Sequence, residues 1–92
     1  MTKVAELQER WNRDADYRKA YEELGPEFAV ARSLIEARKG AGFTQAELAA
    51  RMKTTQSAVA RMESGRVPPS IRTLVRVARA TGTRLRIHFE RG

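Results

Sequence analysis

Hydrophobic residues recur every three or four positions along most of the chain, a spacing that predicts a mainly helical protein. Between residues 26 and 82 the pattern divides into four stretches, which we expect to form helices at about 26–40, 44–52, 55–64 and 70–82. The residues at their ends agree with these limits. Pro26 suits a first helical turn, and Gly65 and Gly82 accept the left-handed conformation that closes a helix.

The start of the second of these helices carries the clearest local signal. Thr44 can accept a hydrogen bond from a free backbone N–H of the first turn, and Glu47 can reach back to the N–H of Thr44. Phe43 and Leu48 stand at the two positions of a hydrophobic staple around this reciprocal capping box. The sequence therefore predicts a firm helix start at Thr44.

Residues 1–26 are helix-prone, but their apolar stripe changes phase near residues 12–14, so we expect two short helices there. All the Trp and Tyr residues of the chain lie in this arm, at Trp11, Tyr17 and Tyr21. Such aromatic side chains anchor protein interfaces. The arm is therefore either a protein-binding segment or a helical extension that packs on the helix at 26–40.

The end of the chain has a different period. Leu85, Ile87 and Phe89 are apolar and alternate with polar residues, which is typical of a half-buried β-strand. Because an unpaired strand edge invites a second chain, we expect one C-terminal strand that pairs across a homodimer. The alternative is a tail that folds back on its own monomer.

Composition narrows the function. The 92 residues include no Cys and one His, which excludes disulfides and Cys/His zinc sites, and we expect no metal, cofactor or catalysis. No apolar run reaches the roughly 18 residues of a membrane span, so we expect a cytoplasmic chain. The net charge of +7 favours a polyanionic partner. That charge is uneven, with −1 on residues 1–26 and +8 on residues 27–92.

Two short helices joined by a few residues, the second with an exposed polar face, describe a helix-turn-helix. The segments Thr44-Gln45-x-x-Leu48-Ala49, Thr55-Gln56-Ser57-x-Val59-x-Arg61-Met62-Glu63-Ser64-Gly65 and Pro69-Ser70-x-x-Thr73-Leu74 resemble the Cro/cI-type (XRE) helix-turn-helix family. The resemblance covers residues 28–82 and implies a small helical bundle. It departs at Lys53, where the family commonly has glycine and where a left-handed lysine costs on the order of 1 kcal/mol.

The resemblance implies double-stranded DNA, at an inverted-repeat operator, as the partner. A recognition helix enters the major groove N-terminus first, which places Gln56 and Ser57 at base edges and Arg61 one turn deeper. The alternative is an ordinary solvated face. The residues expected to bind DNA are Thr44, Gln45, Thr55, Gln56, Ser57, Arg61 and Arg66. Among these, Gln45 looks like the family's phosphate-binding glutamine. Resemblance to phage repressors also implies a structural ion pair between Arg38 and Glu63.

The order of parts along the chain is similar to that of HigA-type antitoxins of type II toxin–antitoxin systems. It consists of a helical arm at 1–26, a DNA-binding domain at 27–82 and a dimerisation strand and tail at 83–92. The resemblance implies that the chain neutralises a RelE/HigB-like ribonuclease toxin through Trp11, Tyr17 and Tyr21 and represses its own operon, associated with the nucleoid. The alternative is a stand-alone repressor without a toxin partner. The one enzymatic hypothesis that the sequence leaves open is a ribonuclease that uses His88, and we do not expect this activity.

Overall fold

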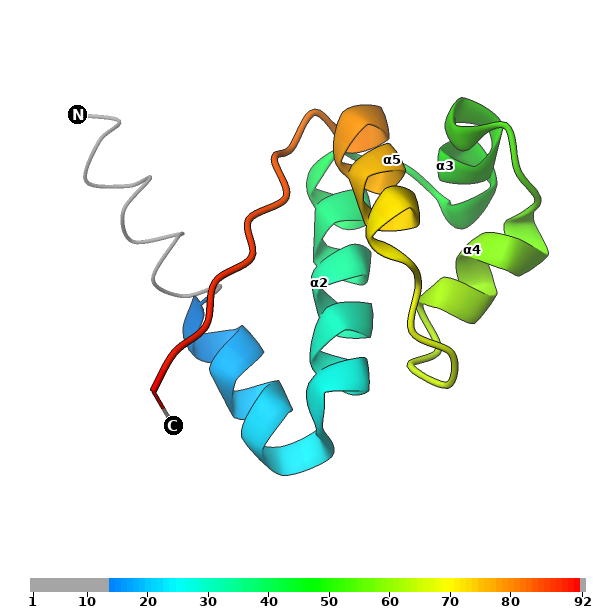
Figure 1. Ribbon diagram of the computed structural model, residues 1–92. Coiled ribbons are helices and arrows are strands. Elements are labelled where there is room, and N and C mark those ends of the chain that lie inside the picture. The colour runs from blue at the N-terminus through cyan, green and yellow to red at the C-terminus, as the bar shows by residue number, and fades with distance from the viewer. Residues whose placement is uncertain (1–13, 92) are drawn as a thin grey trace.

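Residues 14–91 are described by the computed structural model, and they are mainly helical, as the sequence predicts (Figure 1). Four labelled helices follow a helical segment at residues 14–24. They are α2 (Pro26–Gly40), α3 (Gln45–Met52), α4 (Gln56–Met62) and α5 (Ile71–Thr81). Among the described residues, no helix has the length and apolar character needed to cross a membrane.

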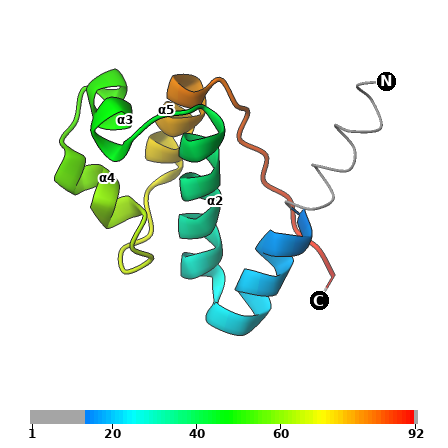
Figure 2. The same cartoon turned by 180° about the vertical axis from the view of Figure 1, so that it is seen from behind.

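All four labelled helices contribute buried side chains to the core, and α3 contributes the most. Leu34 of α2, Leu48 of α3, Val59 of α4 and Val77 of α5 belong to one hydrophobic cluster. Leu48 and Val59 are the largest side chains that are fully buried. Because α3 packs against both α4 and α5, the helix-turn-helix pair rests on α5, which in turn packs on α2 (Figures 1 and 2).

Side-chain caps fix where three of the helices begin. Thr44, Thr55 and Ser70 have extended backbone, and each hydroxyl accepts the backbone N–H three residues ahead. Such a cap stabilises a helix by about 1 kcal/mol because it satisfies an N–H that has no partner within the helix. The starts of α3, α4 and α5 are therefore set by local chemistry, as the sequence predicts.

The arm turns sharply where it joins the bundle. Gly25 has a φ of 98°, and the segment 14–24 and α2 form a V whose apex is this glycine (Figures 1 and 2). In the segment 14–24, Ala20 is buried while Tyr17, Tyr21 and Leu24 are exposed. The first half of the arm, with Trp11, lies outside the described residues.

The predicted C-terminal strand is not present. Residues 83–91 form no regular secondary structure, and the tail runs back past α2 toward the segment 14–24 (Figures 1 and 2). There Arg18 Nη2 lies 3.8 Å from Glu90 Oε1. A strand exists only through hydrogen bonds to a neighbouring strand, and residues 14–91 contain no strand that could pair with the tail. The alternation of Leu85, Ile87 and Phe89 alone does not make one.

Candidate nucleic-acid interface

The outermost helix, α4, has one buried face and one free face. Val59 is fully buried, whereas the four residues on the opposite side, Gln56, Ser57, Ala60 and Arg61, are exposed. Its seven residues are too few for a helix that is stable by itself. The ends of α4 must therefore be held by the rest of the fold.

The turn before α4 is tight and uses an uncommon conformation. Lys53 has φ 56° and ψ 47°, the left-handed geometry expected from the sequence, and is the one non-glycine residue with positive φ among residues 14–91. The N–H of Thr54 then donates to the carbonyl oxygen of Ala49 over 2.9 Å. Thr55 follows as the cap of α4, so three residues suffice to reverse the chain between the two helices.

The end of α4 is held by a partly buried ion pair. Arg38 donates from Nε to Glu63 Oε2 over 2.8 Å and from Nη2 to Oε1 over 3.1 Å. Its third donor, Nη1, reaches the carbonyl oxygen of Phe43 at 2.9 Å. The two side chains are only 12% and 5% exposed. The hydrogen bonds to Glu63 raise the pKa of Arg38 further above its ordinary value, so the pair stays charged on the arginine side at all ordinary pH.

Gln45 joins the same network. As the first residue of α3 it donates from Nε2 to Glu63 Oε1 over 3.1 Å. The residue expected to bind phosphate is thus fixed to the end of α4, and its position depends on the ion pair. Beside it, the Thr44 N–H donates to Glu47 Oε1 and the Glu47 N–H donates to Thr44 Oγ1. The backbone N–H of Thr44, and after it the Thr44 hydroxyl, lower the pKa of the Glu47 carboxylate.

The loop after α4 is anchored on the start of α2. Gly65 is buried with a φ of 76°, and a Cβ added to it would lie 2.8 Å from Cδ1 of Phe28. The Ser64 hydroxyl donates to the carbonyl oxygen of Arg61 and accepts the N–H of Arg66. This loop therefore presents Arg66, exposed, from a fixed backbone. Helical spacing places Phe28 on the apolar stripe of α2, but nothing local to residue 28 indicates a contact 37 positions away.

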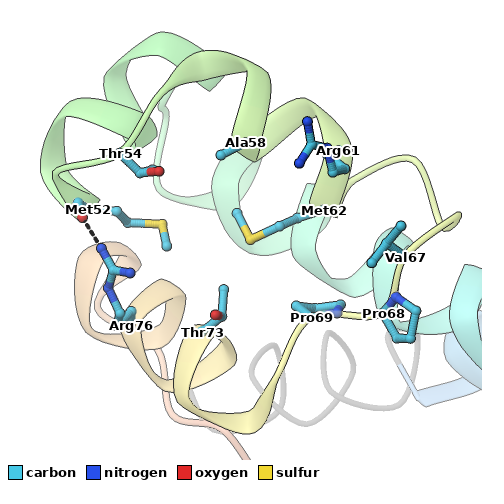
Figure 3. Close-up of a pocket in the computed structure, with 10 residues that line it drawn as sticks. All are labelled: Met52, Thr54, Ala58, Arg61, Met62, Val67, Pro68, Pro69, Thr73 and Arg76. Carbon is cyan, nitrogen blue, oxygen red and sulfur yellow. Dashed lines mark hydrogen bonds between the residues drawn. The ribbon is translucent and has the colours of Figure 1, made fainter.

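A pocket of about 240 Å³ lies along one flank of α4 (Figure 3). Ala58, Arg61 and Met62 lie on its α4 side, and Thr73 and Arg76 of α5 lie opposite them. The guanidinium of Arg76 donates to the carbonyl oxygen of Met52, which holds it at the pocket's edge. Arg76 is not among the site residues predicted from sequence, although its spacing from Arg72 on α5 indicates a basic face.

The other expected site residues lie away from α4. Tyr17 and Tyr21 have ring centroids 6.2 Å apart and are 39% and 48% exposed, while Trp11 lies outside the described residues. Leu85 is half-buried, and Ile87 and Phe89 are exposed on the tail. Residues 14–91 contain no cluster of three or more His, Cys, Asp or Glu side chains that could hold a metal ion.

Comparison with known proteins agrees with this geometry. The family model described as helix-turn-helix matches residues 34–87, which include α3, the turn, α4 and α5. No curated protein and no solved structure matches the chain.

Proposed function

Because the chain belongs to the helix-turn-helix family, a family of sequence-specific DNA-binding regulators, we propose that it represses transcription by inserting α4 into the major groove of operator DNA. Members of this family are generally not enzymes. The observation that carries the proposal is the exposed face of α4, which is free of intramolecular ion pairs among the described residues and held at both ends. In the cell, operator binding would keep the chain with the chromosomal DNA of the cytoplasm.

The side chains on that face suit base reading. Gln56 and Ser57 stand in the first turn, which enters the groove first, and Arg61 stands one turn later. A glutamine amide pairs with the N6 and N7 atoms of adenine, and an arginine pairs with O6 and N7 of guanine. Each good contact of this kind contributes about 1–3 kcal/mol of discrimination.

Phosphate contacts would fix the register of α4. Thr44 and Gln45 lie at the N-terminus of α3 and Thr55 at that of α4, where free N–H groups favour an anion. Arg66 lies just beyond the end of α4. These contacts carry no sequence information, but they set which bases face Arg61.

Selection from a random duplex library tests base reading. We expect the wild-type chain to enrich a defined half-site, and the variant Arg61→Ala to lose preference at one position of it. The control Arg32→Ala, on the exposed side of α2, should enrich the same sequences as the wild type. An Arg61→Ala variant with unchanged preference would remove Arg61 from base reading, and a wild-type chain that enriches nothing would contradict sequence-specific binding.

We further propose that two chains pair through Leu85, Ile87 and Phe89 of the tail. Support comes from the exposure of these apolar side chains, since Phe89 is fully exposed and Ile87 is 61% exposed, and pairing would remove them from water. A dyad between two copies would place the α4 helices about 34 Å apart, one turn of DNA, on an inverted repeat. Sedimentation equilibrium tests this, because Phe89→Ser should give a monomer where the wild type gives a dimer. A wild-type monomer at tens of micromolar would refute the pairing.

We propose that the chain is an antitoxin, in which residues 1–26 bind and inhibit a RelE/HigB-like ribonuclease. Support comes from the neighbouring exposed rings of Tyr17 and Tyr21 and from the 57% exposed side chain of Leu24. Large apolar side chains at this exposure suit a protein interface. On this proposal the chain divides into a toxin-binding arm at 1–26, a DNA-binding domain at 27–82 and a dimerisation tail at 83–92.

Native purification of the tagged chain tests the antitoxin proposal. We expect a small basic ribonuclease to accompany the wild type in equal amounts and to be inhibited by it. The double variant Tyr17→Ser, Tyr21→Ser should lose this partner and still bind DNA. Arg84→Gln, an exposed change on the tail, serves as the control that retains the partner.

A stand-alone repressor is the second candidate, and one observation favours it. Ala20 of the arm is only 4% exposed, so the segment 14–24 contributes to the packing of the chain. On this candidate the arm stabilises the domain and binds no toxin. The same purification separates the two, because a stand-alone repressor returns without a partner and the double tyrosine variant then changes stability alone.

A further inference from the structure

A second hollow lies beside the pocket of Figure 3, between the end of α3 and α5. It has a volume of about 350 Å³. Its lining contains four basic side chains, at Arg51, Lys53, Arg76 and Arg79, which are named here the basic track. Met52 and Arg76, both drawn in Figure 3, line both hollows, so the second hollow adjoins the pocket on the flank of α4.

The four basic residues of the track form no ion pair among the described residues. Neither hollow has an acidic side chain in its lining. Like charges gathered on one surface repel one another and are stabilised when an anion binds between them.

Two of the four side chains are held in place by contacts. The guanidinium of Arg76 donates to the Met52 carbonyl oxygen, and that of Arg51 lies 4.3 Å from the ring centroid of Phe43. Lys53 projects from the left-handed turn that precedes α4. A guanidinium that is already held by such a contact loses little conformational freedom when it binds a ligand.

We propose that the basic track binds the phosphate backbone of DNA on one flank of α4, beyond the bases that α4 reads. This rests on the proposed operator binding. A helix in the major groove has a sugar–phosphate strand on each side. Gln45, an expected phosphate contact, is bonded to Glu63 at the end of α4, and one flank of α4 borders the pocket that Arg76 lines. Continuity with Arg61 therefore favours DNA over an acidic protein segment as the occupant.

Salt-dependent binding to a 30-base-pair duplex of mixed sequence tests the track, because phosphate contacts need no operator. The variant Lys53→Gln, Arg79→Gln removes two exposed charges of the track. The matched control, Lys19→Gln with Arg32→Gln, removes two exposed charges from the arm and α2. Fluorescence anisotropy at several KCl concentrations gives the slope of log K against log salt for each.

We expect the track variant to reduce that slope by about 2 per bound chain, since each phosphate contact contributes roughly 0.9. The control should keep the wild-type slope. A track variant with the wild-type slope would overturn the proposal while leaving operator binding intact. A track variant that binds DNA like the wild type and loses only the binding of an acidic protein would overturn it too. A wild-type chain that binds no duplex would overturn operator binding as well.

Arg76 needs a separate pair of variants, because its hydrogen bond to Met52 also supports the fold. Arg76→Lys keeps the charge and Arg76→Gln removes it, and neither has the full guanidinium geometry. We expect Arg76→Gln alone to reduce the slope, by about 1. Equal slopes for the two variants would exclude Arg76 from the track, and circular dichroism establishes that both are folded.

Discussion

Arg38 and Glu63 meet side by side, with Nε 2.8 Å from one carboxylate oxygen and Nη2 3.1 Å from the other. Glu63 is the residue that closes α4, and Arg38 lies in the last turn of α2. The pair therefore joins the two helices at the point where the short α4 would otherwise fray. It also sets the position of Gln45, which shares the Oε1 atom of Glu63.

Removing the charge of Glu63 should destabilise the fold. Breaking a buried pair leaves the other charge without compensation and costs about 3 kcal/mol. We expect Glu63→Gln to lose that amount in urea denaturation. The control is Glu36→Gln, whose partner Arg32 lies 3.8 Å away and more than half exposed, and which should change stability by less than about 1 kcal/mol. Equal effects of the two variants would show that the Arg38 pair is no stronger than a surface pair.

Lys53→Gly should stabilise the chain. The left-handed conformation of Lys53 costs an ordinary residue about 1 kcal/mol, and glycine adopts it without strain. We expect a gain of somewhat under 1 kcal/mol in urea denaturation, because glycine also loses more entropy on folding. Lys53→Ala, which keeps the backbone strain, is the control and should show no gain. A stability gain shared by both variants would trace the effect to the lysine charge instead.

Gly65→Ala should destabilise the fold more than the same change at any other described glycine with positive φ. The new methyl group would lie 2.8 Å from the Phe28 ring, in addition to the strain at φ 76°. Gly82→Ala is a matched control, since its φ is 69° and nothing lies within 4 Å of the added Cβ. We expect the free energy of unfolding to fall by about 3 kcal/mol in Gly65→Ala and by about 1 kcal/mol in Gly82→Ala, measured by thermal denaturation. Adding Phe28→Ala to Gly65→Ala should recover part of the loss, and strictly additive effects would contradict the contact.

Stability should depend on pH through Glu47. Its pKa lies below the ordinary value of 4.5, first because its carboxylate accepts the N–H of Thr44 and then because of the Thr44 hydroxyl. A lowered pKa in the folded state means that the ionised form stabilises the fold. That contribution is complete above the ordinary value and is lost as pH falls through the lowered pKa.

Thermal denaturation at pH 6 and pH 3 measures this effect. The wild type should lose more stability than Glu47→Gln over this interval, because glutamine has no charge to lose. Thr44→Ala should fall between the wild type and Glu47→Gln, since alanine keeps the backbone N–H that contributes most to the lowered pKa of Glu47 and loses only the hydroxyl. If all three lose the same stability, other carboxylates account for the acid sensitivity.

Local chemistry made much of this fold predictable from sequence. The caps at Thr44, Thr55 and Ser70 and the left-handed closure at Gly82 each act within a few residues, so spacing alone locates them. The helix-turn-helix follows from two such helices in succession. The family match over residues 34–87 confirms that part of the interpretation.

Contacts between distant residues were not predictable in the same way. Gln45 and Glu63 are 18 positions apart, and their hydrogen bond exists because α3 packs on α4 and brings its first residue to the end of α4. Arg51 and Arg79 meet at one hollow only because α3 packs on α5. The strand predicted at 83–90, which was expected to pair across a dimer, is absent from the described residues of the single chain, since alternation supplies no partner for a strand.

The seven residues of α4 commit only Val59 fully to the core, and the helix is secured at its two ends by Thr55 and Glu63. Its exposed residues therefore make no packing contribution to the core. Substitution at those few positions can give a duplicated copy of the chain a new target while its architecture stays the same. For the same reason the domain is a good starting point for engineered specificity, in which a library confined to one short surface explores new binding sequences without the usual loss of stability.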